Sequence, residues 1–117
     1  MTNAKDVEAG FSRLLRLVKS RGLPGVSRAK GPPHALMVAD IAFATLHDSA
    51  TLALCCPKHQ KVLLMDISPN VYFETDQQIG QNLVLVNLAA IDDEELSLRL
   101  HDAWEYAAPD NLRKYVD

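Results

Sequence analysis

The stretch from His34 to Cys56, HALMVADIAFATLHDSATLALCC, decides the fold class. It contains three short runs of β-prone apolar residues, separated by small and polar residues. The runs are 35–39, 41–46 and 51–55. Ala39-Asp40 and His47-Asp48-Ser49 supply the turns, and connections this short join antiparallel neighbours. The stretch therefore predicts a three-stranded antiparallel meander.

The sequence after the meander alternates between helical and extended patterns. Pro57 suits the first turn of a helix, which the breaker at 68–70 ends. Two further strands are predicted at 71–75 and 83–88, each rich in β-branched, aromatic or large aliphatic residues. The meander is thus followed by one helix and a strand pair.

The start of the last helix carries two independent signals. Asp92 and Glu95 have the spacing of a capping box, and Ile91 with Leu96 can form a hydrophobic staple. The apolar face continues through Leu96, Leu100, Ala103, Trp104 and Ala107. We therefore expect Trp104 to lie in the core.

The N-terminal part contains a helix followed by an irregular connection. Apolar residues recur at spacings of three and four over residues 4–20, which predicts an amphipathic helix. The stretch 22–33 contains three glycines and three prolines, so it is predicted to form a loop. The element order is then α-β(3)-α-β(2)-α.

This order predicts an α+β protein. Three helices are too few to cover both faces of a parallel sheet, so a two-layer arrangement is favoured, with helices on one face of a five-stranded antiparallel sheet. The 117 residues are the size of one domain, expected to span 1–117. No apolar run approaches the ~20 residues that cross a bilayer, so we expect a cytoplasmic protein without a membrane partner.

Charge is distributed unevenly along the chain. In residues 1–31, seven bases against two acids leave a net charge of +5. In residues 32–117, five bases against thirteen acids leave −8. The overall charge of −3 conceals two parts that would present opposite fields to a partner.

The N-terminal cations form a basic stripe. On a helical wheel Lys5, Arg13, Arg16 and Lys19 share the flank beside the apolar face. Several cations on one surface can neutralise several phosphates at once. The candidate nucleic-acid-binding residues are Arg13, Arg16, Lys19, Arg21, Arg28 and Lys30. The alternative interpretation is a solvated helix face.

Other reactive residue types do not form a site. A tetrahedral metal site needs a fourth ligand beside Cys55, Cys56 and His59, and the sequence places none near them. The four acids at 92–95 are explained by a helix N-terminus, where negative charge is stabilised by the helix dipole. The stretch 22–31 matches neither a nucleophile elbow nor a phosphate-binding loop. The sequence predicts neither catalytic residues nor a metal site, and no cofactor.

Several segments match a known pattern. They are Leu23-Pro24-Gly25-Val26, Ile41-Ala42-Phe43-Ala44, Tyr72-Phe73-Glu74-Thr75 with Gly80, Leu83 to Leu88, Ile91 to Leu96 and Asp102 to Pro109. Together they cover about residues 11 to 113, and the chain resembles the MmcQ/YjbR-like family of small bacterial proteins. The resemblance implies a secretion-chaperone-like α-β(3)-α-β(2)-α fold and a DNA-binding role.

The second hairpin departs from that family. Members often carry Thr-Pro-His and a basic residue there, where this chain has Thr75-Asp76-Gln77 and Asn87. The family-aligned positions are Thr75, Gln77 and Asn87. We interpret the chain as a non-enzymatic binding module with weak, salt-dependent DNA contact through the N-terminal basic helix. The alternative is a protein-interaction or chaperone-like module that holds a peptide or a second copy of itself.

Overall fold

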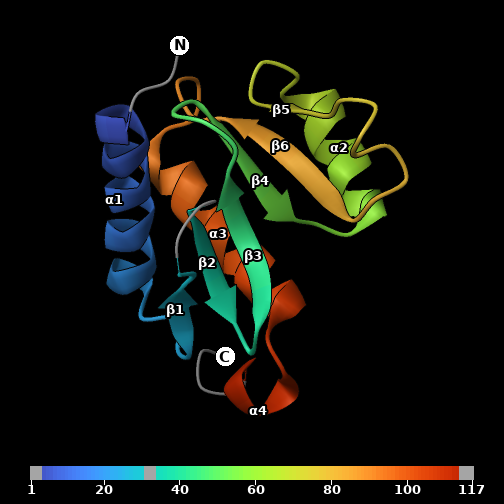
Figure 1. Cartoon of the computed structure of the whole chain (residues 1–117). Helices are drawn as coiled ribbons and strands as arrows, with labels where there is room; N and C mark the ends of the chain where they lie inside the picture. The colour runs from blue at the N-terminus through green and yellow to red at the C-terminus, as the bar shows by residue number, and fades with distance from the viewer. Residues whose placement is uncertain (1–3, 31–33, 114–117) are drawn as a thin grey trace.

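The computed structural model describes residues 4–30 and 34–113, and Figure 1 shows the arrangement of their helices and strands. In chain order the elements are α1 (Ala4–Arg21), β1 (Val26–Arg28), β2 (Ala35–Val38), β3 (Ile41–Leu46), β4 (Thr51–Cys55), α2 (Lys58–Ile67), β5 (Tyr72–Phe73), β6 (Leu83–Asn87), α3 (Asp93–Ala107) and α4 (Asp110–Arg113).

The strands form one antiparallel sheet in the order β1-β2-β3-β4-β6-β5. The predicted α+β class and the meander β2-β3-β4 are confirmed. The sheet has six strands rather than five, because β1 forms in the stretch 22–33 that was predicted to be irregular. Val26 pairs with Val38, and Arg28 pairs with Leu36. This three-residue strand is therefore stabilised by pairing with β2, and its own sequence shows no strand periodicity.

Local backbone geometry sets the meander. Ala39 and Asp40 have φ of 49° and 66°, in the left-handed region that a two-residue type I′ hairpin turn requires. The β2–β3 register shifts between Leu36 and Met37. At this bulge the neighbouring residues Phe43 and Ala44 are both fully buried, where regular alternation would bury only one of them.

The second strand pair is shorter than predicted. β5 contains only Tyr72 and Phe73, where a strand over 71–75 was expected. The chain turns immediately afterwards, because Gln78 N donates to Thr75 O at 3.0 Å and the Gln78 side chain accepts from Thr75 N at 2.9 Å. β5 therefore ends at Phe73, before this turn.

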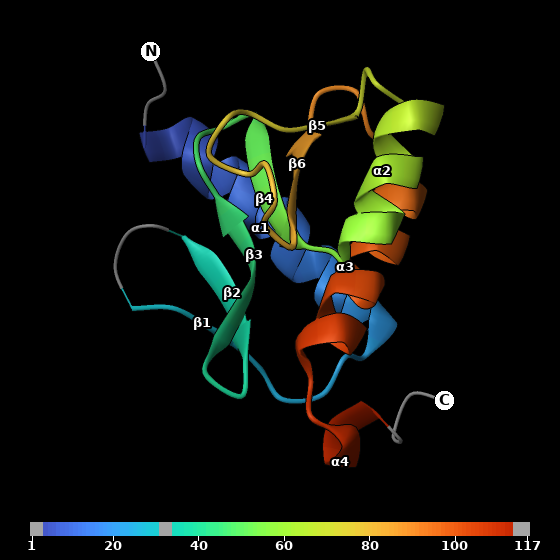
Figure 2. The ribbon, with the colours of Figure 1, turned by 90° about the vertical axis from the view of Figure 1, so that its right-hand side faces the viewer.

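The helices pack on one face of the sheet, as predicted (Figure 2). α1 and α3 contact each other, and α3 lies across β3 and β4. α2 contacts β5 and β6, and its Leu64 lies near Leu54 and Val84 of the sheet, as does Arg99 of α3. The core therefore sits between this face and the helices.

Two predictions for α3, its start and the burial of Trp104, are confirmed. The Asp92 carboxylate accepts from Glu95 N at 2.8 Å, which confirms the helix start. Trp104 is fully buried, as expected, and its Nε1 donates to Pro24 O at 3.0 Å. Among the helices described, none is long and apolar enough to cross a membrane.

Candidate functional site

The arginines of the predicted basic stripe reach across to the start of α3. The Arg13 guanidinium contacts Asp93 Oδ1 at 2.6 Å and donates to the carbonyl oxygens of Leu88 at 2.9 Å and Ile91 at 2.7 Å. Arg16 pairs with the other Asp93 oxygen at 3.0 Å. The structure brings both side chains together on one carboxylate, so they fasten α1 to α3.

The other candidate cations have different surroundings. Arg21 donates to Ser97 Oγ at 2.6 Å and lies 2.9 Å from His101 Nδ1. The Arg28 guanidinium sits over the Phe11 ring at 4.6 Å from its centroid. Lys19 and Lys30 are exposed, and the side chain of Lys5 lies outside the described residues. Much of the predicted stripe thus contributes to packing within the chain.

We expect the ion pairs of Arg13 and Arg16 with Asp93, which join α1 to α3, to weaken in acid. Hydrogen bonds from Arg13 and Arg16 hold the pKa of Asp93 below its ordinary value. A carboxyl whose pKa is depressed by folding stabilises the protein above its unfolded pKa, and that contribution disappears as pH falls through the folded pKa. Urea unfolding from pH 7 to pH 3 should therefore show a stability gap between wild type and Asp93→Asn that closes below about pH 4.

The neighbouring substitution Glu94→Gln is the control for this experiment. It removes a carboxylate from the same helix end, but Glu94 is exposed and lies outside the arginine contacts. A gap for Asp93→Asn that stays constant with pH would show that the arginine pairing is not its cause.

The family-aligned hairpin positions are not brought together. Thr75 Oγ1 donates to Gln78 Oε1 at 2.6 Å, and Gln77 N donates to Thr75 Oγ1 at 3.4 Å, so these two lie in the turn after β5. Asn87 ends β6, where its amide nitrogen donates to Asn70 O at 3.4 Å and its Oδ1 accepts from Ala89 N at 3.2 Å. The side chains of Thr75 and Asn87 contact their local turns, whereas the contact of Gln77 is made by its backbone nitrogen.

The cysteines lie close to α2. Cys56 is buried and Cys55 half-buried, and both are free thiols. Burial raises the pKa of Cys56 to about 11 and also raises the pKa of Cys55. Within residues 4–30 and 34–113, no group of three or more His, Cys, Asp or Glu side chains is placed to hold a metal ion.

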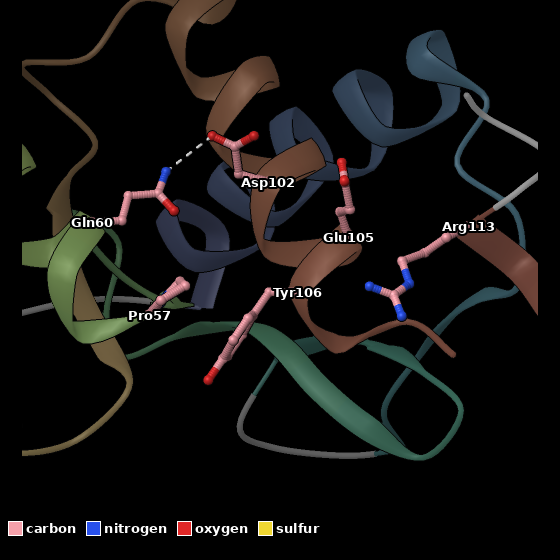
Figure 3. A pocket seen from close by; sticks show the side chains of 6 residues that line it. All are labelled: Pro57, Gln60, Asp102, Glu105, Tyr106 and Arg113. Atoms are coloured by element: carbon pink, nitrogen blue, oxygen red, sulfur yellow. Dashed lines mark hydrogen bonds between the residues drawn. The ribbon is translucent and has the colours of Figure 1, made fainter. Parts of the chain in front are cut away.

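A groove between α2 and α3 was missed from the sequence (Figure 3). It encloses about 290 Å³, and we call it the α2–α3 groove. Its lining residues are Pro57, Gln60, Asp102, Glu105, Tyr106 and Arg113. A second, acidic hollow of about 240 Å³ lies along the first half of α3 and is lined by Asp92, Glu94, Glu95, Leu98 and Arg99.

The polar row that faces α2 could have been recognised from its spacing. Glu95, Arg99, Asp102 and Tyr106 are four, three and four residues apart, so they share one flank of α3. Tyr72 of β5 donates to the Glu95 carboxylate. Burial, followed by this hydrogen bond, raises the pKa of Tyr72 well above its ordinary value.

The row also meets α2. Asp102 Oδ2 accepts from Arg99 at 2.8 Å and from the Gln60 side-chain amide at 3.3 Å. Figure 3 shows Gln60 reaching towards Asp102 across the gap between the helices. The other side chains in the groove include a carboxylate, a phenol and a guanidinium, so it can accept hydrogen bonds and pair with cations.

Four large apolar side chains are exposed on the two helices that form the α2–α3 groove, and we call them the apolar rim. Leu63 and Ile67 follow Gln60 at three and seven residues, so they share its side of α2, and they are 58% and 74% exposed. Leu98 and Tyr106 of α3 are 43% and 46% exposed. Burying such exposed apolar groups against a partner is favourable, because it removes apolar surface from water.

Comparison with known proteins shows the fold alone. No protein-family model matches the chain, and no curated protein matches it either. The fold is similar to the crystal structure of Deinococcus radiodurans protein DR2400, described as carrying the family-model domain DUF419. The two share a TM-score of 0.63 and 14% identity, over 88% of this chain and 84% of that one.

Proposed function

We propose that this protein is a non-enzymatic binding module that recognises another protein through the α2–α3 groove and its apolar rim. One observation carries the proposal. Of the seven large hydrophobic side chains exposed in the described residues, five lie on α2 and α3. They are Val62, Leu63, Ile67, Leu98 and Tyr106. Val62 lies on the far side of α2 from Gln60, and the other four residues form the apolar rim. Exposed apolar groups gathered beside a polar groove are typical of surfaces that bind proteins.

The state of the buried reactive groups supports a role without catalysis. A thiol whose pKa is about 11, as in Cys56, is protonated at neutral pH and is a weak nucleophile. The Tyr72 phenol is held as a hydrogen-bond donor to Glu95. Both groups therefore serve packing and positioning in this proposal.

We also infer that the chain belongs to the MmcQ/YjbR-like family and acts in the bacterial cytoplasm. The resemblance of residues 11 to 113 supports the family, and so does the shared fold with a DUF419 protein, because DUF419 is related to the MmcQ/YjbR fold. Two free cysteines are compatible with a reducing compartment.

A library of displayed random peptides tests the protein-binding proposal. We expect selection on the full chain to enrich peptides whose affinity, measured by fluorescence anisotropy, falls more than about tenfold in Ile67→Glu and in Leu98→Glu. Loss of one well-buried aliphatic contact of ~1.5 kcal/mol or more corresponds to such a change. Ile79→Glu is the matched control, since Ile79 is 61% exposed but lies in the β5–β6 connection.

Two results would contradict the proposal. Selection that enriches no peptide on the folded chain is one of them. Enriched peptides that bind all three variants as tightly as they bind the wild type are the other, because the apolar rim would then play no part.

Nucleic acid is the second candidate ligand, and a specific group of residues favours it. Lys19, Arg28 and Lys30 are exposed in the segment that carries a net charge of +5. Arg13 and Arg16 already pair with Asp93, and Arg21 contacts α3, so they have less charge to offer. Any contact would be local and weak, because the remainder of the chain carries −8 and opposes a polyanion.

Salt dependence tests this candidate. If Lys19, Arg28 and Lys30 each meet a phosphate, log K for duplex DNA should fall with log salt at a slope of about −0.9 per contact. Changing all three residues to Gln should abolish most of the slope. Lys58→Gln should leave the slope unchanged, because Lys58 is exposed on α2, outside this group. Fluorescence anisotropy at low and near-physiological salt measures both. Binding that is absent at low salt, or a slope that survives the triple change, would exclude this site.

A further inference from the structure

α3 has two polar flanks that receive different partners. The flank facing α1 carries Asp93, Ser97 and His101, at successive spacings of four. Arginines of α1 meet all three, because Asp93 pairs with Arg13 and Arg16, and Arg21 contacts the other two. A basic amphipathic helix is therefore already seated against one side of α3.

The opposite flank has no such helix among the described residues. Towards α2 it meets Gln60, and towards the sheet it meets Tyr72, and both of these are neutral. The α2–α3 groove and the acidic hollow together contain five carboxylates against two arginines. Arg99 pairs with Asp102, and Arg113 pairs with Asp110 outside the groove. Three of the five carboxylates, those of Asp92, Glu94 and Glu105, are exposed.

The positions of two exposed carboxylates strengthen this contrast. Glu94 is exposed at the start of α3. Glu105 is exposed near its end, and its carboxylate lies 3.8 Å from His101 Nε2. They are eleven residues apart, about three helical turns, and Leu98 lies between them on the same outward side. Acidic positions therefore bracket an apolar one along the helix.

We propose that the α2–α3 groove binds a basic amphipathic helical segment of a partner protein. This rests on the proposed function and names the class of its ligand. Apolar side chains of the segment cover Leu63, Ile67 and Leu98 of the apolar rim, and its lysines or arginines face Glu94 and Glu105. On one side of α3, the arginines of α1 already meet polar and acidic side chains. The proposed segment would make the same kind of contact on the α2 side, in the helix-in-groove mode of recognition.

The experiment uses the full chain and two labelled model peptides of about 14 residues, roughly four helical turns. Both have the same leucine face, with lysine on the polar face of one and glutamate on that of the other. Anisotropy should show that the lysine peptide binds at least tenfold more tightly. The double variant Glu94→Gln/Glu105→Gln should weaken its binding about tenfold, because the loss of each exposed ion pair lowers the affinity by a factor of a few.

A charge-matched variant separates site binding from general attraction. Asp40→Asn/Asp76→Asn changes the net charge equally, and both residues are exposed on turns without lining the α2–α3 groove or the acidic hollow. It should bind the lysine peptide as wild type does. Asn is compatible with the positive φ of 66° at position 40.

Each other outcome has a defined meaning. If the two double variants weaken binding equally, or both peptides bind alike, the basic class is wrong, while loss of binding in Ile67→Glu would still support a protein-binding face. If sedimentation shows a dimer that Ile67→Glu dissociates, a second copy occupies the groove and the inference is overturned. If neither peptide binds a chain that still selects library peptides at the rim, the inference fails and the proposed function stands.

Discussion

Replacing Trp104 with Ala is expected to lower the free energy of unfolding by about 3 to 5 kcal/mol. The indole is fully buried on the inner face of α3, so its removal leaves a large cavity between this helix and the sheet. Its Nε1 also donates to Pro24 O, and the substitution leaves that carbonyl without this donor. A loss of this size is a large fraction of the stability of a small domain.

Urea unfolding followed by circular dichroism measures the effect without relying on indole fluorescence. Trp104→Phe keeps most of the ring volume but loses the hydrogen bond, so it should cost less than the Ala change and remain measurable if Trp104→Ala fails to fold. Tyr106→Ala is the control on the same helix, because this aromatic is 46% exposed and its removal should change stability little. Equal losses for Trp104→Ala and Tyr106→Ala would contradict the packing argument.

The sequence predicts the fold wherever the decisive interactions are local. The left-handed turn at Ala39-Asp40 joins strands that are adjacent in the chain. Asp92 caps α3 by accepting a hydrogen bond from the backbone nitrogen of Glu95, three residues later. β1 was missed because it has only three residues and depends on pairing with β2. β5 was predicted too long because the Gln78 side chain turns the backbone at Thr75. Neither effect leaves a periodic signal.

The candidate site was harder to predict for the same reason. The helical wheel placed Arg13 and Arg16 on one flank, but their partner Asp93 is 80 and 77 residues away in the sequence. Gln60 and Asp102 are separated by 42 residues in the sequence, and strands β5 and β6 lie between them in the chain. The α2–α3 groove therefore forms only once those strands have paired and brought the two helices together. Side-chain spacing indicates which residues share a face, whereas tertiary packing decides what that face meets.

Lys61 offers the second large effect, and it concerns a buried charge. Its side chain is 4% exposed, and its Nζ lies 2.8 Å from Glu74 Oε1. The same ammonium donates to the carbonyl oxygens of Gln78 at 2.9 Å and Gln81 at 2.8 Å, so it fastens the β5–β6 connection to α2. Lys61→Met fills a similar volume but removes all three contacts. It leaves a carboxylate and two carbonyls without their cation.

We expect Lys61→Met to reduce the free energy of unfolding by about 3 kcal/mol, the lower end of the range for breaking a buried ion pair, because Glu74 keeps 24% exposure. Adding Glu74→Gln should recover part of that loss, since the uncompensated charge is then gone. Lys58→Met, on the exposed side of the same helix, should change stability by less than about 0.5 kcal/mol. Amide hydrogen exchange should also rise in residues 75–82 of Lys61→Met. Unchanged exchange there, with stability equal to that of Lys58→Met, would show that the ammonium does not hold this connection.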